Sequence, residues 1–585
     1  MTSVDDLFKR PSLPGGSIKR KFEAPDPHFA YKTAKLSPNS QSNSDDKLQA
    51  RVEEEADADD VEVGPSLPPE DEDEDDEGRF FGGGVTKDAA QALDYLNDYD
   101  GEGELLSEEK IDSAWLKRLA VSFEKKLKKN VELRARYEME PQKFMASEAD
   151  LDAEIKSWSL LGEHPELYEE FAGSESAASL VGLLAHENTD IVIGAIEILS
   201  ELLDEDVEAD QRQWDALAAA LVDADLLGLL MSNLGRLDEQ NESDQSGVYH
   251  TLAVMEALAS QQALAEQIGR KEVLDWLCRR IQKAEFPVAQ NKQYAAEVLQ
   301  VLLQSSPVLR KRLAIDVDGV DLFLQLLARY RKRDPPKDSP EEEFAENIFD
   351  SLTCVVDDAE GKTKFVEAEG VELCLLMLQE GTFSKMRALR LLDHTVGGQG
   401  PAAVRACEHL VEAGGLKTLF GMFMKKADST TVEHLLGIFS VILRLLPGES
   451  AARIRTLAKF AEKNYQKTDR LVGLRHDYAK RFRAVDEEVC REQRSIDEED
   501  WPSRADEWFS RRLDGGLFCL RLIDVVIAWV LAEDAGAKER VKSSDDDTVM
   551  AIKTSLEEQI ADLDPEVESD EDLRDMLRTL VSCLQ

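Results

Sequence analysis

Apolar residues from position 106 onward recur three and four apart, and alternating β-branched residues are nearly absent. This spacing predicts α-helices. One apolar triplet with spacing i, i+3, i+4 returns along the chain as Leu180/Leu183/Leu184, Leu226/Leu229/Leu230, Val273/Trp276/Leu277, Val320/Phe323/Leu324, Val371/Cys374/Leu375 and Leu416/Leu419/Phe420. The first members lie 46, 47, 47, 51 and 45 residues apart. A period of this length predicts a repeat architecture.

Each triplet is followed by a second apolar helical segment, at residues 191–203, 248–259, 294–303, 344–356, 386–395 and 435–446. Two or three helices per repeat are typical of armadillo and HEAT proteins. We therefore predict an all-α, right-handed superhelical solenoid. An irregular helical protein is the alternative, and six units near one period disfavour it.

Several triplets follow a small or acidic turn: Asp318-Gly319, Glu369-Gly370 and Gly414-Gly415. We expect glycine to supply the backbone freedom of the turn and the acid to favour the helix N-terminus. Residues 106–172 and 448–585 are helical but off the period, so we predict N-terminal and C-terminal caps around about six armadillo-type repeats at 173–447.

Charge changes the picture at the N-terminus. The chain has 119 acidic and 70 basic residues and a formal charge of −49. Residues 1–105 hold 27 acids and 11 bases, and 15 of those acids lie in 52–77, which has no Lys or Arg. Such a segment buries too little apolar surface to fold, so we predict a disordered tail at 1–105. The acidity also disfavours direct nucleic-acid binding.

The cysteines and the apolar stretches indicate where in the cell the protein is found. Seven cysteines are scattered singly, without a zinc or dense disulfide spacing. The N-terminus has no apolar signal region, and the longest apolar stretch, 517–532, contains Arg521 and Asp524. We expect a soluble intracellular protein that does not enter a membrane.

Two short basic clusters precede the acidic run: Lys19, Arg20 and Lys21, then Lys32 and Lys35. Two clusters about ten residues apart can occupy two acidic pockets of an import receptor at once. The spacing predicts a nuclear localisation signal, with an import receptor as partner. A solvated charge cluster in the tail is the alternative.

A solenoid presents the last helix of each repeat along one binding surface. Armadillo repeats read roughly A-x-W-A-L-x-N-L there, with the Trp and Asn positions facing the partner. This frame selects Glu197 and Glu201, Ala253 and Ala257, Glu297 and Val301, Asn347 and Ser351, and Arg390 and His394. The Trp and Asn series of import receptors is missing, because WxxxN occurs nowhere.

From these positions we predict a partner-binding groove formed by Glu197, Glu201, Glu297, Asn347 and Ser351. The glutamates would attract a basic segment, while Asn347 and Ser351 would bond an extended backbone. Ordinary solvated side chains on surface helices are the alternative.

The sequence contains fragments that resemble catalytic motifs, but each lacks a required residue or neighbour. Gly361-Lys362-Thr363 resembles the end of a phosphate loop, but the loop needs Gly where Val356 lies and no strand precedes it. Gly82-Gly83-Gly84 falls in the predicted tail. Asp393-His394 is an adjacent acid and base, and neighbouring helix residues do not face each other. The eight histidines show no metal spacing. We expect no enzymatic activity, no metal and no cofactor.

Particular stretches go beyond a generic solenoid. These are 186–190 (HENTD), 219–223 (AALVD), 233–239 (NLGRLDE), 291–299 (NKQYAAEVL), 346–352 (ENIFDSL), 391–394 (LLDH) and 511–518 (RRLDGGLF). Together they resemble the catenin-beta-like family, in order, from about residue 106 to 530. The resemblance implies a nuclear armadillo protein associated with the spliceosome through the nineteen complex and the cell-division-cycle five-like protein. It also implies binding of basic segments of splicing factors.

The combined expectation is a non-catalytic nuclear scaffold in pre-mRNA splicing. A nuclear-transport adaptor for basic cargo is the runner-up, disfavoured by the missing WxxxN series. An enzyme or its regulatory subunit is a third class, and no site in the sequence supports it. The sequence leaves open whether the chain forms a homodimer.

Overall fold

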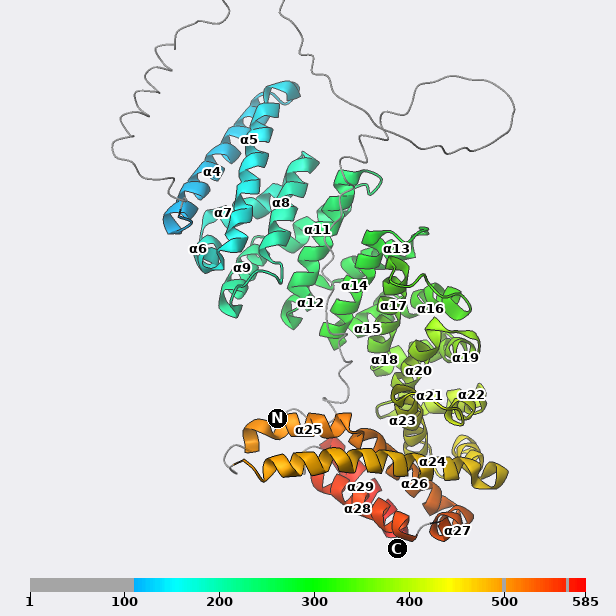
Figure 1. Ribbon diagram of the computed structural model, residues 1–585. Helices are drawn as coiled ribbons and strands as arrows, with labels where there is room; N and C mark the ends of the chain where they lie inside the picture. The colour runs from blue at the N-terminus through cyan, green and yellow to red at the C-terminus, as the bar shows by residue number, and fades with distance from the viewer. Residues whose placement is uncertain (1–109, 497–500, 545, 564–567, 585) are drawn as a thin grey trace, which may run out of the picture. The chain divides into compact units, whose positions relative to one another are not determined.

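The computed structural model describes residues 110–496, 501–544, 546–563 and 568–584 (Figure 1). Every regular element within these residues is a helix, as predicted. The described residues from Leu116 onward belong to one compact unit. The predicted tail at 1–105, with its basic and acidic segments and Gly82-Gly83-Gly84, lies outside the described residues.

Two helices precede the repeats, α4 (Ser113–Arg136) and α5 (Met145–Lys156). Short 3-10 helices surround α5: η1 (Pro141–Lys143), η2 (Ser157–Glu163) and η3 (Pro165–Leu167). Several of their apolar side chains, including Phe123 and Trp158, are fully buried. The rings of Phe123 and Trp158 meet edge to face with centroids 5.7 Å apart. This segment is therefore packed core rather than an extension of the tail.

Six three-helix units follow within the described residues. They are α6 (Tyr168–Ala172), α7 (Glu175–Gly182) and α8 (Thr189–Leu202); α9 (Gln211–Asp223), α10 (Leu226–Leu234) and α11 (Glu242–Ala259); α12 (Gln262–Ile268), α13 (Lys271–Gln282) and α14 (Gln290–Ser305); α15 (Pro307–Asp316), α16 (Gly319–Ala328) and α17 (Pro340–Val355); α18 (Ala359–Glu367), α19 (Gly370–Glu380) and α20 (Phe383–Val396); and α21 (Pro401–Glu412), α22 (Gly415–Phe423) and α23 (Ser429–Leu445). Two further 3-10 helices, η4 (Leu183–Ala185) and η5 (Arg329–Arg331), extend α7 and α16.

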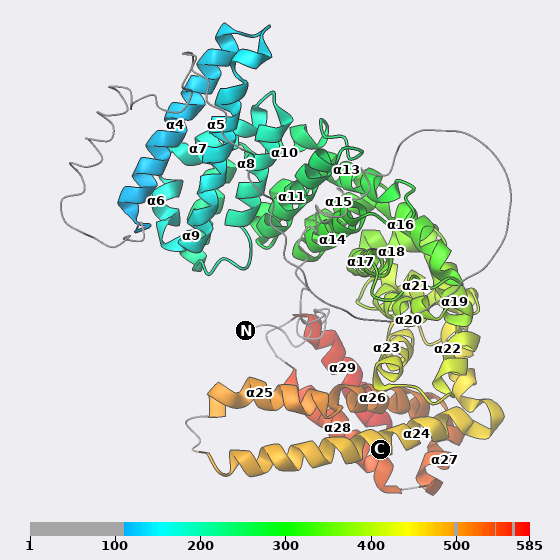
Figure 2. The ribbon, with the colours of Figure 1, turned by 45° about the horizontal axis from the view of Figure 1, so that its top comes forward.

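The predicted triplets lie in the second helix of each unit, apart from Leu183 and Leu184, which fall in η4. The second apolar segments lie in the third helices. We call α8, α11, α14, α17, α20 and α23 the third-helix row. Each of these helices packs against the next one (Figures 1 and 2). Residues more than 40 positions apart in the sequence are thereby brought side by side.

Side-chain caps fix where several third helices begin. Asn188 accepts a hydrogen bond from the Asp190 amide (3.0 Å) at the start of α8. Asp428 accepts one from the Thr431 amide (2.7 Å) at the start of α23. A cap of this kind is worth about 1 kcal/mol because it satisfies an amide that has no partner within the helix. The local sequence thus sets the register of the row.

The turn between first and second helices differs from the prediction. The left-handed residue is Asp318 (φ 55°) or Glu369 (φ 59°), not the glycine that follows it. Gly370 instead begins α19, where a Cβ atom would lie 2.5 Å from the ring of Phe365. Glycine is therefore needed here for close packing of the first helix. Of these three turns, only the last has its left-handed residue at a glycine, Gly414 (φ 83°).

After several third helices, a basic side chain near the start of the next helix bonds the end of that third helix. Arg310 donates to the Leu303 carbonyl (2.7 Å), Lys362 to the Val356 carbonyl (2.5 Å), and Arg453 to the Leu446 carbonyl (2.9 Å). Cys407, at the corresponding place, contacts the Val396 carbonyl. The last carbonyls of a helix have no helical partner and carry partial negative charge, which a cation satisfies.

This device explains Gly361-Lys362-Thr363. Lys362 is only 3% exposed, and its ammonium also donates to the His394 carbonyl (2.6 Å) at the end of α20. The Thr363 hydroxyl donates to the Ala359 carbonyl (2.8 Å) within its own helix. The residues that resemble a phosphate loop therefore join α17, α18 and α20, in line with the rejection of a nucleotide site.

The C-terminal helices are α24 (Ala451–Gln493, interrupted at Glu462–Tyr465), α25 (Trp501–Asp514), α26 (Leu517–Glu533), α27 (Ala535–Ser544), α28 (Asp546–Asp562) and α29 (Glu568–Cys583). The apolar helix α26 packs against α23, α24 and α28. Among the described residues, no single helix is long and apolar enough to cross a bilayer. The bent pairs α9/α10 and α25/α26 meet that test by length and composition only.

Candidate partner-binding surface

The sequence-predicted groove residues lie on the third-helix row. Glu197 and Glu201 are on α8, Glu297 is on α14, and Asn347 and Ser351 are on α17. Glu201 is exposed, whereas Glu197, Glu297 and Asn347 are half-buried. These four side chains remain candidates for contact with a partner.

Ser351 does not present its hydroxyl to a partner. Its side chain is 0% exposed, and its oxygen makes no hydrogen bond within the described part of the chain. The frame placed Ser351 on the same face as Asn347 because the two are four residues apart, but the packing of α17 encloses the second position. We therefore leave Ser351 out of the site considered below.

The first half of the row, on α8, α11 and α14, concentrates acidic and aromatic side chains. The Tyr294 hydroxyl donates to the Glu256 carboxylate (2.6 Å), and the Tyr249 and Tyr294 rings lie 5.0 Å apart. Burial, reinforced by Glu256, raises the pKa of Tyr294. We call the set Glu197, Glu201, Tyr249, His250, Glu256, Tyr294 and Glu297 the acidic face.

The charges at the α8 end of the acidic face are only weakly compensated. Within the described residues, the Glu197 and Glu201 carboxylates form no ion pair or hydrogen bond. The pKa of Lys156 is raised mainly by its hydrogen bond to Asp152, and Glu197 adds to this at longer range. Burial lowers the pKa of His250, and Glu201 only partly offsets that shift. The field of these glutamates therefore extends outward from the row.

The second half of the row, on α17, α20 and α23, pairs its charges between neighbouring helices. Arg387 bonds Glu346, and Arg390 donates to Asp350 (2.9 Å). His394 lies 2.9 Å from Asp357. Burial raises the pKa of Asp350, although Arg390 and Arg387 lower it in part. Little charge is left to recognise a partner there.

The same pairing resolves the acid and base at 393 and 394. Asp393 bonds His434 on α23 (2.9 Å), whereas His394 bonds Asp357 beyond α17. The two adjacent residues thus face different neighbours, as their helical positions predicted. Among the described residues, no group of three or more His, Cys, Asp or Glu side chains is placed to hold a metal ion.

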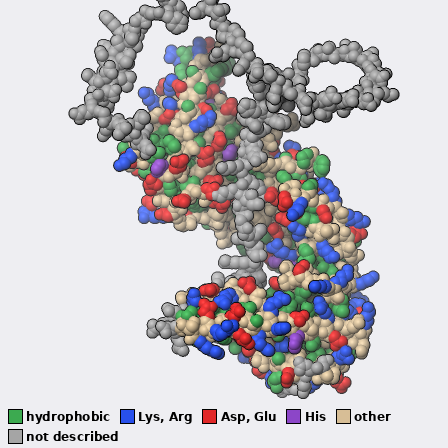
Figure 3. All heavy atoms as spheres, in the orientation of Figure 1, with side chains coloured by type: hydrophobic (Ala, Val, Ile, Leu, Met, Phe, Trp, Pro, Cys, Tyr) green, Lys and Arg blue, Asp and Glu red, His purple; other side chains and the backbone are tan. Residues whose placement is uncertain are grey.

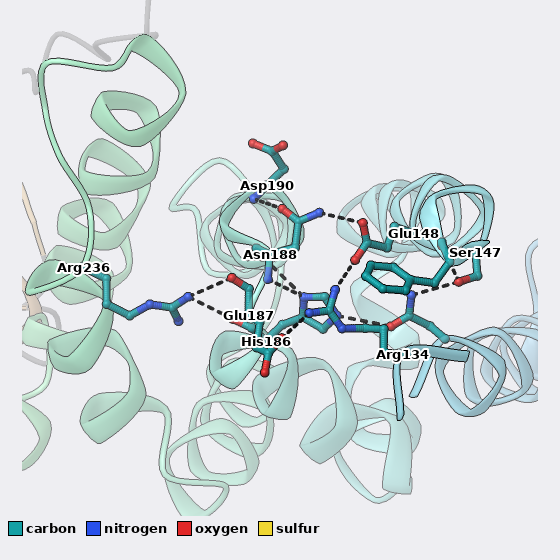
Figure 4. A network of polar contacts seen from close by, with 10 residues as sticks. Arg134, Ser147, Glu148, His186, Glu187, Asn188, Asp190 and Arg236 are labelled. Atoms are coloured by element: carbon teal, nitrogen blue, oxygen red, sulfur yellow. Dashed lines mark hydrogen bonds and ion pairs between the residues drawn. The ribbon is translucent and has the colours of Figure 1, made fainter. Parts of the chain in front are cut away.

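A polar network at the start of the repeats contains His186, Glu187, Asn188 and Asp190 of the 186–190 stretch (Figure 4). Arg134 of α4 pairs with Glu148 of α5, and the Asn188 side-chain amide donates to the same carboxylate (3.1 Å). His186 Nε2 lies 3.2 Å from the side-chain oxygen of Asn130. Burial lowers the pKa of His186. The network joins the two opening helices to α8.

Arg236 extends this network to the second unit. Its guanidinium donates to the carbonyls of His186 (3.1 Å) and Glu187 (3.2 Å) (Figure 4). The Asn233 side chain donates to the Leu184 carbonyl (2.8 Å). The stretches 186–190 and 233–239, which suggested a family, therefore bond to each other across one repeat boundary.

The stretches that resemble the catenin-beta-like family thus form polar contacts between neighbouring repeats. Comparison with known proteins points to the same family. Residues 90–557 match the family model described as "Catenin-beta-like, Arm-motif containing nuclear". The chain belongs to the catenin-beta-like family. The resemblance, the armadillo-like fold and the nuclear location expected from the sequence are thereby confirmed.

Relatives in this family span most of the chain. The Schizosaccharomyces pombe "Beta-catenin-like protein 1 homolog" is 35% identical over 468 residues, covering 80% of each chain. Human "Beta-catenin-like protein 1" is 35% identical over 436 residues, which is 72% of this chain and 76% of the human one. A solved structure from a study of the interaction between cadherin and beta-catenin aligns with a TM-score of 0.40 and 12% identity, over 82% of this chain and 98% of that chain.

Other stretches that carry the family resemblance also have structural roles. Arg280, 6% exposed, pairs with Glu239 (2.6 Å) and Glu285 (3.1 Å). The Asn291 side chain donates to Glu239 (3.2 Å) and to the Gln245 carbonyl (2.9 Å). These contacts join the 233–239 and 291–299 stretches across the next repeat boundary.

Sequence reasoning missed Glu256, Tyr249 and Tyr294 of the acidic face. The frame samples two positions per helix and chose Ala253 and Ala257 on α11, and Glu256 is adjacent to the second. A one-residue shift of the frame on α11 would have found it. The predicted nuclear localisation residues Lys19, Arg20, Lys21, Lys32 and Lys35 lie outside the described residues.

Proposed function

We propose that this chain is a non-catalytic nuclear scaffold in pre-mRNA splicing and that its acidic face binds basic segments of spliceosomal proteins. Partners of the expected kind are the nineteen complex and the cell-division-cycle five-like protein. The observation that carries the proposal is the contrast in charge pairing along the third-helix row. Glu197 and Glu201 on α8 form no ion pair within the described residues, whereas Asp350 on α17 pairs with Arg390 of α20.

The chemistry of the acidic face suits a Lys- or Arg-rich segment. Carboxylates form charge-assisted hydrogen bonds with ammonium and guanidinium groups. The half-buried Tyr294 ring adds a cation–π contact and apolar surface for the stems of those side chains, and the buried Tyr249 ring supports it from behind. Acidic and basic side chains are interspersed on the molecular face seen in Figure 3, so net charge alone does not define the site.

The proposal is tested by titrating the full chain into a fluorescein-labelled, Lys- and Arg-rich peptide and following fluorescence anisotropy. We expect affinity to fall steeply as salt rises, because the screening length shortens to about 8 Å at physiological ionic strength. The double variant Glu197→Lys/Glu201→Lys should weaken binding about tenfold or more. Neither carboxylate makes a hydrogen bond or ion pair within the described residues, so the change to lysine breaks no such contact.

The matched control is Glu272→Lys/Glu412→Lys, which makes the same change in net charge at exposed positions on α13 and α21. It should leave affinity nearly unchanged. Equal losses in both double variants would show that only net charge matters and would reject the acidic face as a site. Mass spectrometry of proteins captured from nuclear extract by wild type and by Glu197→Lys/Glu201→Lys then tests the splicing role, since spliceosomal proteins should be lost selectively.

A further inference from the structure

A cavity of about 630 Å³ opens between α24 and α28, far along the chain from the acidic face. One face of α24 lines it with Arg475, His476, Lys480 and Arg483. Residues 476, 480 and 483 follow one another at helical spacing, so their side chains project from the same side of the helix. Thr548 and Ala551 of α28 lie opposite. Four of the ten residues that line the cavity therefore carry basic side chains, against two carboxylates.

The cations differ in how they are used. Arg475 is committed to the core, because its Nε donates to Asp524 (2.6 Å), a carboxylate that is 0% exposed. Burial raises the pKa of Asp524 to about 6, against the effect of Arg475. By contrast, Lys480 and Arg483 are exposed and form no hydrogen bond or ion pair with any other described residue. Their charge is available to a ligand.

The shape of the cavity limits that ligand. Ala479, Ala484 and Ala551 contribute only methyl groups to the lining, which leaves room in front of the two cations. Glu487 and Asp547 also line the cavity, so a long polyanion would meet carboxylates as well as bases. A formal charge of −49 further disfavours a nucleic acid strand. A single compact dianion fits the space in front of the two cations. It is also short enough to avoid the carboxylates and the overall negative charge that disfavour a long polyanion.

We propose that this cavity binds the phosphate group of a phosphorylated serine or threonine in a partner peptide. The Arg483 guanidinium offers a planar fork that matches phosphate oxygens, and the Lys480 ammonium adds a point charge. The neighbouring Glu487 carboxylate accepts hydrogen bonds from backbone amides of the peptide. The site is independent of the acidic face, since it selects the opposite charge.

The test uses the full chain and two immobilised degenerate peptide libraries, one with a central phosphoserine and one with serine. We expect phosphorylation-dependent retention of the wild type. Lys480→Glu/Arg483→Glu should reduce that retention about tenfold or more, because it replaces attraction by repulsion. Lys480→Gln/Arg483→Gln should reduce it to a smaller extent. Circular dichroism melting of each variant checks that the fold is kept.

The control is Arg455→Glu/Arg494→Glu, which changes net charge equally at exposed positions on and just after α24, outside the cavity. It should retain the phosphorylated library like the wild type. Equal retention of both libraries, or unchanged retention by Lys480→Glu/Arg483→Glu, would overturn the proposal. So would oligouridylate binding that requires Lys480 and Arg483, because it would assign the cavity to RNA.

Discussion

The two halves of the third-helix row share one scaffold but use charge in opposite ways. On α17, α20 and α23, each acid of the pairs Glu346/Arg387, Asp350/Arg390 and Asp393/His434 contacts a base on the next helix. In the first half, Glu256 of α11 instead accepts a hydrogen bond from Tyr294 of α14, and Glu197 and Glu201 of α8 form no ion pair within the described residues. The difference lies in the residues of the neighbouring helix, because the helices of both halves pack in the same order.

This contrast shows why a list of acidic residues is a poor guide to a binding surface. An exposed pair is worth only about 0–1 kcal/mol, but it cancels the field that would otherwise attract a partner. A glutamate without such a partner contributes little to folding and keeps its charge for binding. We therefore expect changes of charge in the paired half to act on stability and those in the acidic half to act on affinity.

We expect the largest effect at Lys362 of α18, whose charge holds together α17 and α20 of the paired half. Lys362→Met removes the ammonium that donates to the Val356 and His394 carbonyls. The two carbonyls then lack this hydrogen-bond donor in a buried environment. We expect a loss of about 2–4 kcal/mol in the free energy of unfolding, measured by urea denaturation.

Lys364→Met on the same helix is the matched control, because Lys364 is only half-buried and its ammonium bonds no other described residue. It should change stability by less than about 0.5 kcal/mol. If both variants lose the same stability, the capping role of Lys362 is wrong.

Much of the fold could be predicted from the sequence because it follows from one repeated apolar pattern. The triplets such as Val320/Phe323/Leu324 mark the second helices, and the segments after them mark the third helices. The role of glycine in the turn was misjudged at Gly370, because its need arises from the Phe365 ring across the turn. Local sequence shows a glycine but not the side chain it must accommodate.

The candidate site was harder to predict because exposure and pairing depend on neighbouring repeats. Four-residue spacing placed Asn347 and Ser351 on one face, yet only packing shows that Ser351 is enclosed. Likewise, Arg390 and His394 occupy frame positions but are bonded to Asp350 and Asp357, about 40 residues earlier. A frame read on one helix cannot include the helix beside it.

Glu256 lies on the middle helix of the acidic face, and we expect its charge to contribute to binding. Glu256→Gln removes the charge but keeps an oxygen that accepts from the Tyr294 hydroxyl. Affinity for the basic peptide should fall about threefold to fivefold, which corresponds to about 1 kcal/mol, while the urea midpoint stays nearly unchanged. Glu272→Gln on α13 is the control for net charge. A loss of stability without a loss of affinity would assign Glu256 a structural role only.

We expect the smallest effect from Arg387→Gln, which makes the paired half more like the acidic half. Arg387→Gln removes the cation that pairs with Glu346, so the paired half gains an uncompensated carboxylate next to the acidic face. The Arg387 guanidinium also lies 3.8 Å from the centre of the Phe383 ring, and its loss should cost about 0.5–1 kcal/mol of stability. Affinity for the basic peptide should rise about twofold at low salt, because one more carboxylate faces the ligand.

Arg405→Gln, an exposed change on α21, gives the same net charge without freeing Glu346. If affinity rises equally in Arg387→Gln and Arg405→Gln, the gain comes from overall charge and pairing along the row is irrelevant. If it rises only in Arg387→Gln, and disappears as salt screens the added carboxylate, then pairing between adjacent third helices decides where this solenoid attracts basic partners.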